Sequence, residues 1–294
     1  FRQHDEEQIL DGLAASGPDR FQSWLGSLQR PSPAFDTLRA AIGRYLDSGD
    51  SRRVAQLAHT LNTFRRIRHF QFDRFIVVNI PSAGLRYYSA DTLTLQMRVV
   101  AGQTSKRTPR FAAWCTGLVL YPYWNIPRRI AIKEMLPLFR RVPGLATVMD
   151  IQVLDEKGRT IDPAGIDWKT VSPADFPYTL RQAPGCENAL GVLKFELNDP
   201  FDVYMHDTNL KRAFGANYRY LSHGCIRLEK ASQLGNLLLD HRLDTAFLAA
   251  CFKDQRPSPV PLAKPVPVFV VYLTALPDST GRIIWLKDIY HLRH

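Results

Sequence analysis

The stretch "RFIVVNIPSAGLRYYSADTLTLQMRVVAG", Arg74 to Gly102, decides the fold class. β-Branched and aromatic residues dominate three segments of it, and short turn-forming groups separate them, so it predicts consecutive β-strands. Strand-like segments of the same composition recur later in the chain: "FAAWCTGLVLYP" (111–122), "VLKFELN" (192–198), "FDVYMHD" (201–207), "VPVFVVYLTAL" (266–276) and "RIIWLKDIY" (282–290). The last two, with "PDSTG" between them, predict a late β-hairpin.

The residues before this stretch have a different period. Apolar residues recur at helical spacing through residues 1–68, and "SGPD" and "RPSP" interrupt them, as expected between helices. The helical positions are Ile9, Leu10, Leu13, Phe21, Trp24, Leu25, Leu28, Phe35, Leu38, Ile42, Tyr45, Leu46, Leu57, Leu61 and Phe64. The sequence therefore predicts an α+β protein with an N-terminal helical module, 1–68, and a mainly β domain, 69–294.

A long, proline-rich section interrupts the strands between about 121 and 190. It contains a helical segment, "AIKEMLPLF" (131–139), and an irregular one, "RQAPGCENALG" (181–191). An insertion of this length in a compact domain is typical of a functional lid. A further helix, "EKASQLGNLLLDH" (229–241), follows the cysteine motif considered below.

The composition narrows the class of protein. A net charge of +10 favours an anionic partner, but the basic residues form only short groups with no nucleic-acid-binding motif, so nucleic acid is not an expected partner. No apolar run is long enough to span a membrane. The chain begins with Phe1, so we expect a signal or anchor segment to have been removed.

If Cys225 is a free thiol, the three other cysteines, Cys115, Cys186 and Cys251, form at most one disulfide.

Residues 220–231, "YLSHGCIRLEKA", hold the main candidate for chemistry. A cysteine nucleophile needs a base or a positive field that favours its thiolate. Gly224 allows a tight bend that brings backbone N–H groups around the Cys225 sulfur, where they could also hold an oxyanion. Arg227 is suited to bind a carboxylate through two hydrogen bonds.

Spacing alone leaves the role of these residues open. His223, two residues before Cys225, and His206, in "VYMHDT" (203–208), are both candidate bases. The same two histidines, with Cys225 and Asp207, also offer zinc-binding atoms, although the spacing matches no common zinc motif. A buried cysteine with no chemical role is the third interpretation.

Taken together, these motifs resemble the YkuD-type L,D-transpeptidase family, whose signature is a histidine, a spacer and Ser/Thr-His-Gly-Cys, commonly with Arg or Asn two residues later. The resemblance covers roughly residues 60–290 and is greatest to the YcbB-like branch. It is carried by "VVNIPSAGLRYYS", "RVVAGQTSKRTP", "YPYWNIPRRIAIKEMLP", "RQAPGCENALGVLKFEL", "VYMHDT", "SHGCIR", "KASQLGNLLL" and the closing "VVYLTAL" and "GRIIWLKDIY". Large members of that branch carry an inserted peptidoglycan-binding module, for which we find no room before residue 68.

The resemblance implies a YkuD-like β-sandwich with a capping subdomain, and it implies a role for each motif residue. Cys225 would be the nucleophile, His206 the general base and His223 a supporting residue. The Gly224 and Cys225 amides would form the oxyanion hole, and Arg227 would orient the donor peptide or the cysteine loop. The substrate side would include Trp124, Asn188, Tyr204, Thr208 and Ser222.

The implied activity is crosslinking of peptidoglycan stem peptides in the periplasm, with a part in cell-wall biogenesis and cell shape. A thioester would form at an L-centre of the donor, and a diaminopimelate amine would resolve it, giving 3→3 or 1→3 links. No metal or cofactor is expected, and carbapenem-type compounds are candidate inhibitors. Hydrolysis of the same acyl-enzyme by an L,D-carboxypeptidase or endopeptidase, or a non-catalytic wall-binding role, are the alternatives.

Overall fold

The computed structural model describes residues 33–251 and 255–292. The chain forms two compact units, which we describe separately. The described part of the first unit comprises residues 33–65 and 275–285, and that of the second comprises 66–251, 255–274 and 286–292. The helical segments predicted around Ile9 and Phe21 lie outside the described residues.

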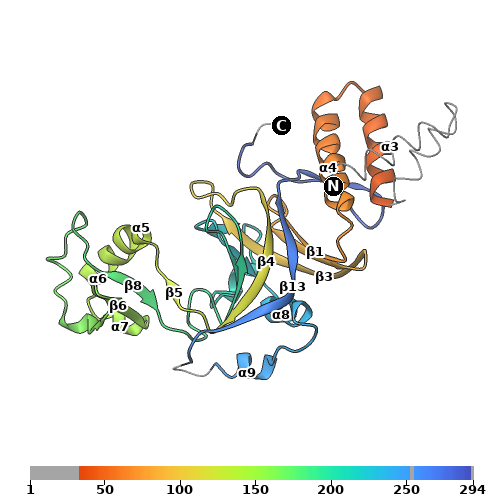
Figure 1. Ribbon diagram of the computed structural model, residues 1–294. Coiled ribbons are helices and arrows are strands. Elements are labelled where there is room, and N and C mark those ends of the chain that lie inside the picture. The colour runs from red at the N-terminus through yellow and green to blue at the C-terminus, as the bar shows by residue number, and fades with distance from the viewer. Residues whose placement is uncertain (1–32, 252–254, 293–294) are drawn as a thin grey trace. The chain divides into compact units, whose positions relative to one another are not determined.

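The first unit combines two helices with a short β-hairpin (Figure 1). Its elements are α3 (Pro33–Asp47), α4 (Ser51–His69, which continues into the second unit), β14 (Ala275–Pro277) and β15 (Ile283–Trp285). Leu38 and Leu57 are fully buried together with Ala275. Thr60 Oγ1 donates a hydrogen bond to the Ala275 carbonyl at 2.7 Å, which fixes the hairpin to the helix. The predicted N-terminal helices are thus present in the described part of 1–68.

The second unit is built on one nine-stranded sheet, in the order β11-β3-β12-β10-β9-β4-β13-β1-β2. Its strands are β1 (Arg74–Asn79), β2 (Gly84–Ser89), β3 (Thr92–Gly102), β4 (Phe111–Leu120), β9 (Leu193–Leu197), β10 (Met205–His206), β11 (Tyr220–Ser222), β12 (Ile226–Leu228) and β13 (Ser258–Val271). A further pairing between β2 and β3 closes the sheet on itself. The predicted mainly β domain is confirmed.

Alternation of buried and exposed residues explains the closed sheet. Inward side chains along each strand alternate with outward ones, so one apolar set fills the interior. Fully buried core residues include Ile76, Val78, Leu85, Val99, Leu118, Phe195, Ile226 and Val268. Helix α8 (Ala231–Leu238) packs so closely on β9 that a Cβ at Gly235 would lie 2.8 Å from a Leu193 methyl group. A short helix, α9 (Thr245–Ala249), follows it.

The predicted late hairpin is wrong in its first arm. Residues 266–271 belong to β13, which pairs with β4 and, in parallel, with β1. The Asn79 side chain donates to the Leu273 carbonyl at 3.0 Å and accepts from the Leu273 N–H at 2.8 Å. Because this amide satisfies the backbone just beyond β13, the chain leaves the sheet there, and only Ala275–Pro277 pairs with Ile283–Trp285.

The long interruption between β4 and β9 is an ordered subdomain with its own core (Figure 1). Its elements are β5 (Trp124–Asn125), α5 (Arg128–Ile130), a π-helical turn η1 (Ala131–Met135), α6 (Leu136–Arg141), α7 (Leu145–Val148), β6 (Ile151–Leu154), β7 (Thr160–Ile161), η2 (Pro163–Gly165) and β8 (Thr179–Gln182). The four strands form a sheet in the order β5-β8-β6-β7. Trp168, Phe139 and Phe176 are buried between this sheet and its helices.

Candidate active site

Strands β10 and β12 bring the two sequence motifs together. They pair in parallel, with Met205 opposite Ile226 and His206 opposite Arg227. The Ile226 N–H donates to the Tyr204 carbonyl at 3.0 Å, which extends the pairing toward Cys225. Side chains opposite one another on neighbouring strands share a face, and so do those two residues apart on one strand. His206, Arg227, Tyr204 and Cys225 therefore belong to one face.

Cys225 is a free, half-buried thiol. Burial raises its pKa above the ordinary value, and hydrogen bonds from the Tyr204 backbone and hydroxyl offset only part of that effect. Burial also raises the pKa of Tyr204, so this phenol stays protonated and can donate. The resting site therefore holds a neutral thiol at neutral pH, which needs a base in order to react.

His206 has the properties of such a base. Its side chain is buried, and Nδ1 lies 2.5 Å from the Asp207 carbonyl oxygen. Because a carbonyl can only accept, Nδ1 carries the proton and Nε2 is left with its lone pair. Burial, followed by the charge of Arg227, lowers the pKa of His206 to about 3, so the ring is neutral at neutral pH.

Asp207 and Gly191 hold this histidine in place. The Asp207 N–H donates to the Leu193 carbonyl at 2.8 Å, and its carboxylate accepts from the Val192 N–H at 3.2 Å and pairs with Lys211. Gly191 has φ +61°, and a Cβ there would lie 2.3 Å from Asp207 Oδ2. Sequence reasoning assigned neither residue a role in supporting His206; the only available signal for Gly191 was a glycine at the end of the insertion.

The cysteine loop is closed by internal hydrogen bonds. Gly224 has φ +124°, a conformation that favours glycine, and its N–H donates to Ser222 Oγ at 3.1 Å. The Ser222 hydroxyl donates in turn to the Cys225 carbonyl at 2.5 Å. Thr108 Oγ1 donates to the Gly224 carbonyl at 2.7 Å from the β3–β4 connection, a support that sequence reasoning missed. Ser222 thus shapes the loop from a buried position.

His223 lies in a different environment from His206. Its side chain is about one-third exposed, at 35%, and Nε2 lies 2.8 and 3.1 Å from the two carboxylate oxygens of Glu134, on the π-helical turn. Lys106 Nζ lies 2.7 Å from the same carboxylate. Partial burial acts to raise the pKa of Glu134, but hydrogen bonds and charge from Lys106 and His223 outweigh it and lower that pKa. Glu134 therefore connects the insertion to the cysteine motif as an anion.

Arg227 brings a positive charge to the face of the sheet that holds His206. Its Nε is buried and has no hydrogen-bond partner within the part of the chain that the structure describes. Burial lowers the pKa of this guanidinium, although arginine remains charged at any ordinary pH. A buried cation with a free donor is suited to receive an anionic group.

The remaining predicted substrate residues divide into two groups. The Tyr204 hydroxyl forms hydrogen bonds with the side chains of Cys225 and Trp124, so Tyr204 is next to the thiol and links it to Trp124. Asn188, by contrast, is 1% exposed and donates to the carbonyls of residues 122, 182 and 183, which closes the base of the insertion. Thr208 is equally buried and accepts from the Leu210 N–H at 3.1 Å. Asn188 and Thr208 therefore hold the frame around the site.

The cysteines have three different environments. Cys186, at the end of the insertion, forms a disulfide with Cys251, after α9. Cys115 is a buried thiol in β4, and burial raises its pKa to about 12. The one disulfide allowed by a free Cys225 is therefore Cys186–Cys251.

The described residues contain neither a metal-binding cluster nor a membrane-spanning helix. No group of three or more His, Cys, Asp or Glu side chains in residues 33–251 and 255–292 is arranged to hold a metal ion. Within the same residues, no helix combines the length and apolar character needed to cross a membrane.

Comparisons with known proteins identify the family of the chain. Residues 73–258 match the YkuD family, described as the L,D-transpeptidase catalytic domain. A Haemophilus influenzae (Rd) protein named "Putative L,D-transpeptidase" is 31% identical over 296 residues, covering 98% of this chain. The chain spans 58% of the length of that relative.

Solved structures with partial similarity include two enzymes of this kind. The catalytic domain of the Enterococcus faecium L,D-transpeptidase acylated by ertapenem shows 13% identity, with a TM-score of 0.33, covering 68% of this chain and 97% of that one. Mycobacterium tuberculosis L,D-transpeptidase 3 shows 13% identity and a TM-score of 0.32, covering 68% and 61%. Family membership rests on the sequence matches, not on these superpositions. The chain belongs to the YkuD family of L,D-transpeptidase catalytic domains.

Proposed function

We propose that this protein is a peptidoglycan L,D-transpeptidase that crosslinks stem peptides through a thioester on Cys225. The observation that carries the proposal is the pairing of β10 with β12, which places a neutral, buried His206 on the same face as a free thiol. A neutral imidazole with a free Nε2 can accept the thiol proton as sulfur attacks a carbonyl. The YkuD family match supports the same chemistry.

The first half of the reaction forms the acyl-enzyme. Cys225 Sγ attacks the carbonyl of an L-centre in the donor stem, and its proton passes to His206 Nε2. The resulting oxyanion is held by the Cys225 N–H and by the Gly224 N–H, which must exchange its bond to Ser222 for one to the substrate. The carbon–nitrogen bond then breaks, and His206 returns the proton to the departing D-amino acid.

The second half transfers the acyl group. The side-chain amine of a diaminopimelate attacks the thioester, His206 accepts its proton, and the thiolate leaves and is reprotonated. Arg227, whose buried Nε has no hydrogen-bond partner within the described residues, receives a carboxylate of the donor. Trp124, from the insertion, contacts Tyr204 beside the thiol and excludes water, which favours the amine over hydrolysis.

The disulfide supports a place for the enzyme outside the cytoplasm. Disulfides persist in oxidising compartments such as the periplasm, where peptidoglycan is also found. We therefore propose the periplasm as its location, and cell-wall biogenesis as its process. Membership of the YcbB-like branch and the choice between 3→3 and 1→3 links stay predictions.

A muropeptide assay tests the proposal. Purified protein is incubated with tetrapeptide muropeptides, and the products are identified and their linkages mapped by mass spectrometry. New dimers that depend on Cys225 support a transpeptidase, and the fragmentation pattern gives the bond. Trimmed monomers alone would instead show a carboxypeptidase. A Cys225→Ala variant with unchanged products would rule out the thioester mechanism.

A further inference from the structure

A second pocket lies on the body of the second unit, outside the proposed active site. Its volume is about 590 Å³, and none of its lining residues comes from β10, β12 or the cysteine loop. It is formed where β4 and β13 meet the start of β1, the end of β2 and Asp240, two residues beyond α8. A pocket of this size is large enough for a ligand of several hundred daltons.

A bulge in β13 creates one wall of this pocket. Pro261 pairs with Gly117 and Val266 with Cys115, so the four residues 262–265 of β13 stand opposite the single residue Thr116. The extra residues leave the ladder, and Ala263, Lys264 and Pro265 line the pocket. Bulges of this kind commonly redirect side chains next to binding sites.

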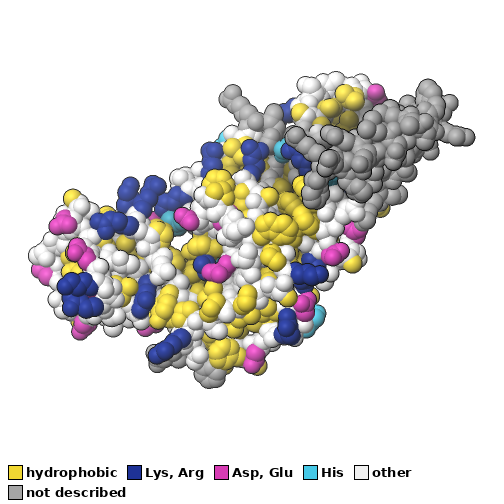
Figure 2. Space-filling model, viewed as in Figure 1, with side chains coloured by type: hydrophobic (Ala, Val, Ile, Leu, Met, Phe, Trp, Pro, Cys, Tyr) yellow, Lys and Arg dark blue, Asp and Glu magenta, His cyan; other side chains and the backbone are white. Residues whose placement is uncertain are grey.

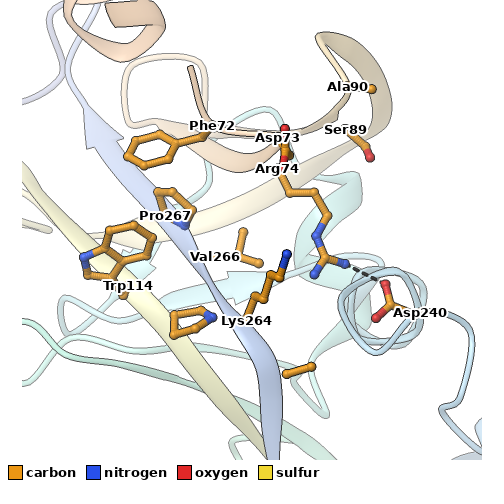
Figure 3. Close-up of a pocket in the computed structure, with 12 residues that line it drawn as sticks. Phe72, Asp73, Arg74, Ser89, Ala90, Trp114, Asp240, Lys264, Val266 and Pro267 are labelled. Atoms are coloured by element: carbon orange, nitrogen blue, oxygen red, sulfur yellow. Dashed lines mark hydrogen bonds and ion pairs between the residues drawn. The ribbon is translucent and has the colours of Figure 1, made fainter. Parts of the chain in front are cut away.

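A second wall, beside β13, is aromatic (Figure 3). Phe72 and Trp114 lie on one side of the pocket with Pro267, and their rings are 5.4 Å apart at 84°. Trp114 is 40% exposed, although its backbone N–H is fixed by Asn198 Oδ1 at 2.7 Å. Figure 2 shows hydrophobic side chains gathered over β4 and β13 on this face of the molecule. An exposed aromatic group of this kind commonly marks a binding surface.

Polar groups face the aromatic wall. Arg74 Nη1 and Asp240 Oδ1 form an ion pair at 2.7 Å, and Lys264 extends toward it (Figure 3). Asp73 also lines the pocket, so the two cations are balanced by two carboxylates. This lining favours an uncharged ligand with many hydrogen-bonding groups and an apolar face. A lipid chain would leave these charges unpaired, and a phosphate backbone would be repelled by the carboxylates.

We propose that this pocket binds the glycan strand of peptidoglycan, through N-acetylhexosamine rings stacked on Trp114. A pyranose ring has one face of C–H groups that packs on an aromatic ring, while its hydroxyl and acetamido groups bond to side chains such as Lys264 and Asp240. The inference rests on the proposed function, because an enzyme that joins stem peptides gains positioning from holding the strand that carries them.

Binding of a peptide-free probe tests the inference. Chitotetraose, the β-1,4-linked tetramer of N-acetylglucosamine, is titrated into the Cys225→Ala protein by calorimetry. We expect binding that Trp114→Ala weakens by about tenfold or more, the effect of losing roughly 1.4 kcal/mol of stacking. Lys264→Glu, a change at an exposed side chain, should weaken it as well. The matched control is Phe201→Ala, an aromatic residue 51% exposed that does not line the pocket.

The outcomes separate this inference from the proposed function. Covalent acylation of Cys225 by a carbapenem, followed by mass spectrometry, reports the catalytic site and should be unchanged in Trp114→Ala. Acylation without chitotetraose binding overturns only the glycan site. Chitotetraose binding without acylation overturns only the thioester mechanism. Equal affinity in the Trp114 and Phe201 variants, or binding of a free stem peptide or a proline-rich peptide in place of the sugar, would also overturn the glycan site.

Discussion

The disulfide between Cys186 and Cys251 makes a quantitative prediction about stability. The two residues are 65 apart in sequence, so the bond closes a long loop in the unfolded chain. With the loop-entropy relation, a closed loop of that length corresponds to about 4 kcal/mol in the free energy of unfolding at 25 °C, and measured values commonly fall between about 2 and 4. In a domain of this size, each kcal/mol moves Tm by about 2–4 °C. If the disulfide contributes the full value of about 4 kcal/mol, replacing both cysteines by serine should lower Tm by about 8–16 °C.

Calorimetry of the Cys225→Ala protein, with and without the two serine substitutions, measures this shift. Adding reductant should lower Tm in the parent and leave the serine variant unchanged, which isolates the disulfide from other effects of reduction. In unreduced, denatured wild-type protein we expect two titratable thiols, those of Cys115 and Cys225. Four titratable thiols, or a serine variant within 2 °C of its parent, would refute the reasoning.

Four further predictions concern the proposed site. His206→Ala should slow carbapenem acylation by at least about a hundredfold, whereas His223→Ala should slow it only slightly. Equal losses of the acylation rate in the two variants would contradict the choice of His206 as the base. Burial lowers the pKa of His206 from 6.5 to about 3, so between these pH values the unfolded chain binds a proton that the folded chain does not. The stability of the fold is therefore unaffected by this group above pH 6.5 and decreases as the pH falls toward 3. His206→Gln should flatten this part of the pH dependence of Tm. Glu134→Gln removes the partly exposed ion pair with Lys106, worth about 0.5–1 kcal/mol, so trimmed products should rise a few-fold relative to dimers by mass spectrometry. An unchanged ratio would argue against a role for the insertion in excluding water. Gly191→Ala should lower the free energy of unfolding, measured by chemical denaturation, by about 1–3 kcal/mol or more, because φ is +61° and the new Cβ would meet the Asp207 carboxylate. The control is Gly158→Ala, where φ is +75° but the surrounding space is open, and its destabilisation should be smaller.

The strand pattern of residues 74–102 was predictable because it depends on neighbouring residues alone. β-Branched side chains and turn groups repeat over short distances, and the first three strands follow them closely. The two motif histidines were visible for the same reason. Spacing alone could not separate their expected roles, because the difference in their surroundings depends on burial: His206 lies in the sheet, whereas His223 faces a carboxylate from the insertion.

Features set by distant residues could not be read from spacing. The hydrogen bonds of Asn188 and Thr208 to buried backbone groups near the insertion and His206 are an example, and a role for the two residues in substrate binding stays a prediction. The partner of Cys186 was open, because any of the cysteines could have approached it. The first strand of the predicted late hairpin belongs mostly to the sheet instead. It ends where the Asn79 side chain, almost two hundred positions earlier in the chain, binds the backbone of Leu273.

The place of β13 in the closed sheet has a consequence for folding during synthesis. This strand is the last of the sheet in sequence, yet it lies between β4 and β1, and Ile76 pairs with Val268. Contacts of such long sequence separation form slowly and late, because the intervening chain must first be available. An emerging chain that already includes Cys225 still has an open ring, with β4 and β1 exposing unpaired edges. Nascent protein is therefore expected to depend on protection from aggregation until β13 is delivered, and truncation before residue 258 should yield an inactive chain that retains every catalytic residue.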